Sequence, residues 1–160
     1  FKPMEAIILA KQVQCSTKEA FDYWTKPKQL QLFFGANHQV ELPKGGPYEI
    51  YFSMEPAAGQ RGSEGCQVID FKADEFLSFT WNAPPSIPEI RNSNKYTNVK
   101  LSFNSINAHS CELKLVHDGW NYGGKGWGDT HQFFQEACPY LLNNMEQAIK
   151  QINTPLGDEK

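Results

Sequence analysis

Three polar side chains, Glu64, His117 and Arg91, could carry acid–base chemistry or hold a charged ligand. Glu64 lies between glycines in an expected strand. A carboxyl group facing inward there would have a raised pKa and could act as a general acid or base. His117 is followed by Asp118 near the end of another expected strand and is the histidine best placed to titrate near neutral pH. Arg91 could bind a ligand carboxylate through two parallel hydrogen bonds.

Each of these side chains also has an ordinary structural role open to it. Glu64 could form a salt bridge with Arg61 or Arg91, or it could face the solvent. A histidine at the end of a strand can simply lie exposed at the rim, and this is the position that we expect for His117. An arginine in a loop is usually exposed as well. The acid–base and binding roles are therefore hypotheses.

The other motifs do not complete a catalytic or metal-binding pattern. The 4 His and 4 Cys residues lack C-x-x-C or H-E-x-x-H spacing, so we expect neither a metal nor a cofactor. The stretch 119–126 has the Gly-x4-Gly-Lys spacing of a phosphate-binding loop, but Gly126 stands where Ser or Thr would bind Mg²⁺. We expect residues 123–128 to form a glycine-rich hinge at a cavity mouth. No G-x-S-x-G motif occurs, although catalytic triads can assemble in space without one.

Aromatic residues make up 13% of the chain, as 11 Phe, 6 Tyr and 4 Trp. Such residues either fill a large core or line an apolar pocket, and packing accounts for most of them. Together with Glu64, Arg91 and His117, the following aromatic residues form the candidate ligand-binding set: Phe79, Trp81, Tyr96, Trp120, Trp127, Phe134 and Tyr140.

Length and composition exclude several classes of protein. A chain of 160 residues is about one domain, and we expect that domain over residues 1–155 with a flexible tail over 156–160. A net charge of −3 argues against a nucleic-acid partner. No apolar run approaches the roughly 20 residues of a membrane-spanning helix. The cysteines are too few and too scattered for a disulfide scaffold.

Hydrophobic periodicity predicts an α+β domain. A strand over 5–15 precedes a helix over 17–25, which Ser16 and Glu19 can open with a capping box, and a short helical turn over 30–34 follows Pro27. A helical period returns over 129–152, where Pro139 should kink the helix. Between these helical parts, alternating apolar and polar residues predict strands over 38–42, 48–54, 62–71, 76–81, 95–104 and 110–118.

This order of elements predicts an antiparallel meander because the connections between strands are short. A curved antiparallel sheet of about seven strands, wrapped round the long C-terminal helix, accommodates all of them. One helix cannot fill the whole concave face of such a sheet. The remaining space should be a cavity.

Short motifs in a fixed order connect the chain with a known superfamily. They are Ala20-Phe21-Asp22-Tyr23-Trp24, Gly45-Gly46-Pro47-Tyr48, Gly62, Glu64-Gly65, Leu77-Ser78-Phe79-Thr80-Trp81-Asn82, Pro84-Pro85, His117-Asp118-Gly119-Trp120, Gly126-Trp127, Phe134 and Leu142-Asn143-Asn144-Met145. Over nearly its whole length the chain resembles the SRPBCC superfamily, with the helix-grip fold called Bet v 1-like or START-like. Within that superfamily it resembles homologues of the heat-shock chaperone ATPase activator.

The resemblance implies a ligand-holding cavity or a protein-binding surface, and it does not imply one reaction. It implies that an acidic residue recurs at the position of Glu64. It also places Cys15 near Cys111 on neighbouring strands, where a disulfide could form, although buried free thiols are the expected state. Some relatives are exported, and the chain begins at Phe1 rather than Met, so export is favoured over a cytoplasmic location.

The function expected first is non-covalent binding of a hydrophobic or amphipathic, lipid-like small molecule between the sheet and the C-terminal helix. The first alternative is a cyclase- or hydrolase-type enzyme that uses an inward-facing pair such as Glu64 and His117. The second is a co-chaperone-like interaction module. The near-neutral charge does not favour a protein partner.

Overall fold

The computed structural model describes residues 2–153. In chain order its elements are β1 (Ile7–Val13), α1 (Thr17–Thr25), α2 (Pro27–Phe33), β2 (Asn37–Val40), β3 (Tyr48–Tyr51), β4 (Val68–Lys72), β5 (Phe76–Trp81), α3 (Pro88–Arg91), β6 (Thr97–Asn107), β7 (Ser110–Asp118) and α4 (Lys125–Asn153). The tail expected over 156–160 lies outside the described residues.

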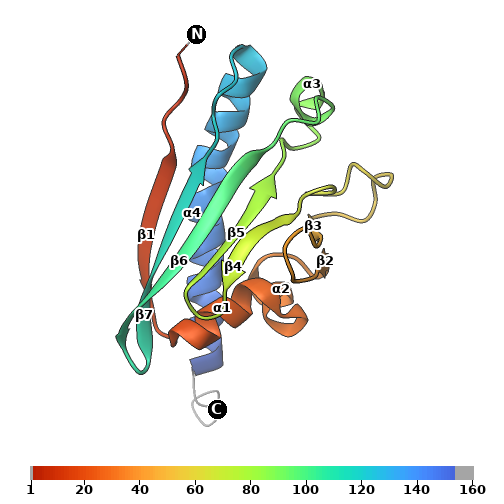
Figure 1. Cartoon of the computed structure of the whole chain (residues 1–160). Helices are drawn as coiled ribbons and strands as arrows, with labels where there is room; N and C mark the ends of the chain where they lie inside the picture. The colour runs from red at the N-terminus through yellow and green to blue at the C-terminus, as the bar shows by residue number, and fades with distance from the viewer. Residues whose placement is uncertain (1, 154–160) are drawn as a thin grey trace.

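The fold is a helix-grip arrangement of an antiparallel sheet and one long helix. Five strands pair in the order β1-β7-β6-β5-β4, while β2 and β3 form a separate two-stranded sheet. Isolated bridges from Pro47 to Gln67 and from Tyr51 to Gly62 connect β3 with the segment before β4. Figure 1 shows α4 running along the length of the main sheet, with α1 and α2 beside the end that carries the β6–β7 turn. The predicted α+β helix-grip fold is confirmed.

Local signals account for both ends of this architecture. The Ser16 hydroxyl accepts the N–H of Glu19 at 3.1 Å, and the Glu19 carboxylate accepts the N–H of Ser16 at 3.0 Å. This reciprocal pair starts α1 and turns its apolar face toward the core. The buried face of α4 follows the expected three- and four-residue spacing through Phe134, Cys138 and Leu141.

The glycine-rich segment before α4 differs from the prediction. Residues 123–128 do not form a hinge, because α4 already begins at Lys125 and includes Gly126 and Gly128. The Lys125 ammonium contacts the Asp129 carboxylate at 2.8 Å, one turn further along this first part of the helix. Within the segment 123–128, the positive φ is that of Gly124, at 112°, in the turn before the helix.

The stretch 62–71 also differs, since a regular strand begins only at Val68. Gly65 has φ of 87°, which an extended strand does not allow. The segment before Val68 therefore forms a loop. Isolated bridges and separate hydrogen bonds, such as that from the Tyr48 N–H to the Cys66 carbonyl at 2.8 Å, join it to β3 in place of a continuous strand pairing. This loop reaches the candidate site described next. Within residues 2–153, no helix is both long and apolar enough to cross a membrane.

Candidate functional site

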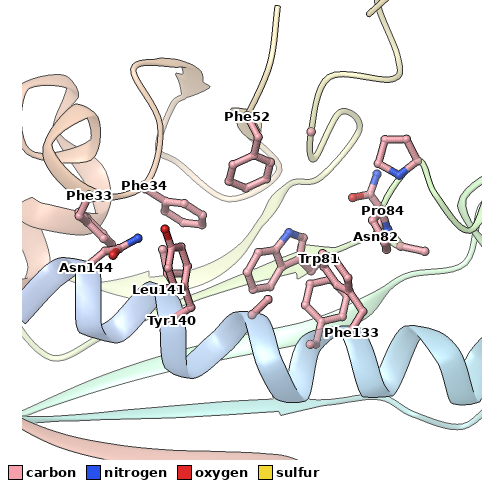
Figure 2. A pocket seen from close by; sticks show the side chains of 15 residues that line it. Phe33, Phe34, Phe52, Trp81, Asn82, Pro84, Phe133, Tyr140, Leu141 and Asn144 are labelled. Atoms are coloured by element: carbon pink, nitrogen blue, oxygen red, sulfur yellow. The ribbon is translucent and has the colours of Figure 1, made fainter.

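A cavity of about 250 Å³ opens between α2, α4 and the end of β5. Trp81, the last residue of β5, lies beside α4, while Phe52 approaches from the opposite side, beyond the end of β3 (Figure 2). The residues that line the cavity are Phe33, Phe34, Phe52, Gly62, Trp81, Asn82, Ala83, Pro84, Pro85, Phe133, Phe134, Ala137, Tyr140, Leu141 and Asn144.

Three of the predicted binding residues, Trp81, Phe134 and Tyr140, line this cavity. The Trp81 and Phe134 rings are buried, with their centroids 4.7 Å apart. On its other side the Trp81 ring meets Phe34 edge to face at 6.0 Å. Tyr140 is 69% exposed and stands at the rim. The cavity therefore has a rigid aromatic floor and an exposed aromatic edge.

Four other predicted aromatic residues do not line the cavity. Phe79 is buried and stacks on Tyr48, with centroids 4.0 Å apart. Trp127 stacks on Tyr122 at 4.3 Å, and the Tyr122 hydroxyl donates to the Tyr96 carbonyl at 3.3 Å. Trp120 is buried and donates its indole N–H to the His117 carbonyl. The side chains of Phe79, Trp120 and Trp127 pack in the core.

Other lining residues were missed at the sequence level. Phe33 and Phe34 lie where α2 ends, and Pro84 and Pro85 follow β5. Phe133 departs from the apolar period of α4 and is 40% exposed. An exposed aromatic residue outside the buried period of its helix is a signal that could have identified it.

Glu64 and Arg91 form a clamp at the edge of the cavity. The Glu64 carboxylate accepts backbone N–H groups from Gly59 at 2.6 Å, Gly62 at 2.7 Å and Arg61 at 3.1 Å. Arg91 donates to the Glu64 carboxylate at 3.0 Å and to the Gly59 carbonyl at 2.7 Å.

Arg91 also donates to the Ala83 carbonyl at 2.9 Å, so one guanidinium joins the loop before β4, the segment after β5 and α3. Since Gly62 and Ala83 both line the cavity, this clamp sets the relative position of two parts of its wall. The hydrogen-bonding capacity of both side chains is directed to the protein itself. They support the site, and the structure does not place them as ligand contacts.

The environment of Glu64 contradicts its predicted raised pKa. Partial burial alone would raise the pKa of this carboxyl group, but the backbone N–H groups of Arg61, Gly62 and Gly59 outweigh burial and lower it. A carboxylate held ionised in this way is a poor general acid at neutral pH. The salt bridge with Arg91, one of the structural alternatives, is the one observed.

His117 is completely buried, which corrects its expected exposure at a strand end. Its Nε2 lies 2.6 Å from the Thr97 hydroxyl oxygen, and its Nδ1 lies 4.0 Å from the Cys138 sulfur. The imidazole packs against the rings of Trp120 and Phe134, each with its centroid 4.7 Å away. His117 thus lies behind the aromatic floor of the cavity and is not one of the residues that line it.

These contacts do not make His117 and Cys138 a catalytic dyad. Burial, with a smaller contribution from His131, lowers the pKa of His117 to about 3. Burial raises the pKa of Cys138 to about 12. The proton therefore stays on sulfur, whereas an activated cysteine needs a thiolate beside a charged partner.

One tautomer of His117 allows every polar group in this buried series of hydrogen bonds to have a partner. A proton on Nε2 of His117 is donated to the Thr97 oxygen, and the Thr97 hydroxyl donates to the Trp81 carbonyl at 3.2 Å. Nδ1 is then free to accept from the Cys138 thiol. Glu64 is bonded to Arg91 and to loop amides rather than to His117, so these two side chains do not form the acid–base pair that the enzyme alternative requires.

Stability should depend on pH through His117. In the unfolded chain this imidazole titrates near the usual value of about 6.5, whereas in the folded protein its pKa is about 3. The unfolded state therefore binds more protons between these values, so stability is complete above the unfolded pKa and is lost as the pH falls through this range. We expect the free energy of unfolding to decrease by about 2 kcal/mol between pH 7 and pH 5.

Urea unfolding at half-unit pH steps measures this decrease. The control is His117→Gln, which can still form hydrogen bonds but does not titrate. Whatever its stability at pH 7, the variant should lose the His117 part of the slope. An unchanged slope in the variant would assign the pH dependence to other groups.

The cysteines remain free thiols. Cys15, Cys66, Cys111 and Cys138 are all buried and unpaired, as expected. Val13 pairs with Cys111 across β1 and β7, and Cys15 follows two residues later. A hydrogen bond to Cys111, with burial, raises the pKa of the Cys15 thiol well above its usual range. Among the described residues, no cluster of three or more His, Cys, Asp or Glu side chains could hold a metal ion.

Comparison with known proteins agrees with this architecture. Residues 14–150 match the family model described as "Activator of Hsp90 ATPase homolog 1-like protein". A Mesorhizobium loti protein aligns with a TM-score of 0.72 and 13% identity, over 94% of this chain and 100% of its own. The Aha1 dimer structure from Colwellia psychrerythraea aligns with a TM-score of 0.60 and 11% identity, over 91% and 96%.

DynU16, from the dynemicin biosynthetic locus, aligns with a TM-score of 0.66 and 12% identity, over 92% of this chain but 48% of its own length. This chain thus spans about half of DynU16. No curated protein sequence matches the chain. At such low identity, the three solved structures establish the shared fold alone.

Proposed function

Because the chain belongs to the Activator of Hsp90 ATPase homolog 1-like family, in the SRPBCC (Bet v 1-like) superfamily whose fold binds ligands in a cavity, we propose that it binds a small molecule in the same way. The ligand is hydrophobic or amphipathic. Its apolar part occupies the space between α2, α4 and the end of β5.

The chemistry of the lining carries this proposal. Among the described residues that line the cavity there is no Asp, Glu, Lys, Arg or His. Transfer of a charged group from water into such a site costs several kcal/mol unless it is paired. An uncharged, apolar group loses nothing comparable and gains the hydrophobic free energy of burial. The buried part of the ligand is therefore uncharged.

The size of the cavity sets the scale of the interaction. A space of about 250 Å³ exceeds the roughly 150 Å³ of an engineered apolar cavity that holds benzene. Burial of about 200 Å² of apolar ligand surface would stabilise a complex by about 5 kcal/mol before the cost of association. A ligand with up to three rings, or an alkyl segment of similar size, matches this scale.

Native mass spectrometry followed by denaturing extraction tests the proposal directly. An additional mass that is released on denaturation would support binding and identify the ligand class. For the protein purified without a ligand, a fluorescence titration with the uncharged, apolar dye N-phenyl-1-naphthylamine replaces this measurement. A signal that does not saturate, with no ligand released on denaturation, would contradict the proposal.

The exposed aromatic rim should contribute to affinity and very little to stability. Phe52 is 59% exposed and Tyr140 is 69% exposed, although both line the cavity. We expect Phe52→Ser and Tyr140→Ser each to weaken dye binding about fivefold, since each removes about 40 Å² of apolar contact. The unfolding free energy should change by less than about 0.5 kcal/mol.

Ile106→Ser is the matched control for these rim variants. Ile106 is 52% exposed and lies in β6, and it is not among the residues that line the cavity. The substitution Ile106→Ser removes exposed apolar surface outside the proposed site, so dye affinity should stay at the wild-type value. Equal losses of affinity in all three variants would indicate non-specific binding to exposed apolar surface.

A further inference from the structure

A second cavity adjoins the first along α4. It has a volume of about 320 Å³ and lies between α2 and the C-terminal part of α4. The two cavities share Phe33, Phe34 and Asn144. Figure 2 shows these three residues together at one end of the first cavity, away from Asn82 and Pro84. A ligand longer than the aromatic cavity would therefore extend past this end into the second cavity.

The second cavity differs from the first in its chemistry. Its lining includes the side-chain amides of Gln31, Asn144, Gln147 and Gln151, and it contains no Asp, Glu, Lys, Arg or His among the described residues. Gln31, Gln147 and Gln151 are exposed and Asn144 is half-buried, and within residues 2–153 none of the four amides forms a side-chain hydrogen bond to another residue. Each amide both donates and accepts hydrogen bonds, as a hydroxyl group does.

We propose that the two cavities form one site for an uncharged amphipathic ligand with a hydroxyl-rich head group, such as a glycoside or another polyol. The apolar part occupies the aromatic cavity, and the head group lies between α2 and α4 against the amides. This inference rests on the proposed function and specifies its ligand class. Among residues 2–153, no cationic side chain lines either cavity to pair with a carboxylate or phosphate, and no anionic side chain lines them to pair with an ammonium group.

Helix geometry gives the dimensions of this two-part site. On α4 the first cavity extends from Phe133 to Asn144, and the second from Asn144 to Gln151. At a rise of 1.5 Å per residue these segments are about 16 Å and about 10 Å long. The ligand is therefore elongated along α4, with its polar end toward the C-terminus of that helix.

Displacement of bound N-phenyl-1-naphthylamine tests the inference. The competitors share one alkyl chain and differ only in the head group: octyl β-glucoside below its micelle concentration, octanol and octanoate. Each hydrogen bond between an amide and a hydroxyl group adds modest affinity. The glucoside should therefore bind about tenfold more tightly than either of the other two.

A pair of double variants assigns this preference to the amides. Gln147→Ala with Gln151→Ala should weaken glucoside binding about tenfold and leave the affinities for octanol and for the dye unchanged. Gln132→Ala with Gln135→Ala is the matched control, because these exposed glutamines lie on α4 outside both cavities. The control should retain the wild-type preference for the glucoside.

The outcomes separate this inference from the proposed function. If the dye binds and the rim variants weaken it, but the glucoside binds no more tightly than octanol or octanoate, the head-group inference is wrong and the apolar site stands. A preference for the glucoside that survives the loss of Gln147 and Gln151 also overturns it. If neither the dye nor any octyl compound binds, the inference falls together with the proposed function.

Discussion

Replacement of Trp81 by Ala should weaken binding of N-phenyl-1-naphthylamine by at least about tenfold. Trp81 lies at the centre of the cavity lining, between Phe34 and Phe134. Its indole supplies a large part of the apolar surface that a ligand would cover, and aromatic rings contribute more than their area through ring contacts. The same change leaves a void in a packed core and should lower the free energy of unfolding by about 3–5 kcal/mol.

Trp127→Ala is the control that separates binding from stability. Trp127 is 5% exposed, close to the 6% of Trp81, but it lies outside the cavity and stacks on Tyr122. Both variants should unfold at lower urea concentration, and Trp81→Ala alone should lose affinity for the dye. The affinity should be measured at a temperature where circular dichroism shows both variants folded. Unchanged affinity in a folded Trp81→Ala protein would remove Trp81 from the binding surface.

Replacement of Arg91 by Met should lower the free energy of unfolding by about 3 kcal/mol. The Arg91 side chain is only 4% exposed, and its partner Glu64 is 18% exposed, so water screens this ion pair poorly. Methionine retains the apolar stem but leaves the carbonyl groups of Gly59 and Ala83 without their donors. Because the clamp joins the loop that contains Gly62 to Ala83, and both of these residues line the cavity, dye affinity should fall together with stability.

Lys72→Met provides the comparison for an exposed ion pair. Lys72 contacts Glu75 at 2.9 Å, and both side chains are more than half exposed. Solvent-exposed pairs of this kind contribute very little, so the free energy of unfolding should change by less than about 0.5 kcal/mol. Urea unfolding of the two variants at neutral pH measures the difference. Equal decreases in the free energy of unfolding would show that the buried position of Arg91 contributes no more to stability than the exposed position of Lys72.

The order of the elements could be predicted because its signals are local. A capping box starts α1 within four residues, and the buried face of α4 repeats every three or four residues. Alternation along β5 and β6 identifies their inward side chains in the same way. Each of these signals depends only on the geometry of a single helix or strand.

The candidate site could be predicted only in part. Trp81 and Phe134 lie at inward positions of regular elements, so periodicity found them. Phe52 lies beyond the end of β3, and Pro84 follows β5, where no period applies. The cavity forms where these segments converge on α4, and convergence of distant segments depends on packing that local patterns do not contain.

The charge states of the polar side chains were decided by the tertiary structure alone. The sequence determined that a carboxyl group lies at position 64, and that an imidazole lies at position 117 near the end of a strand. It did not determine that Arg91, 27 positions away, would bind that carboxylate, or that Thr97 would meet His117 from the neighbouring strand. A pKa depends on burial and on partners within a few ångströms. Only the folded chain brings those partners together, which is why Glu64 became a clamp and His117 a neutral core residue.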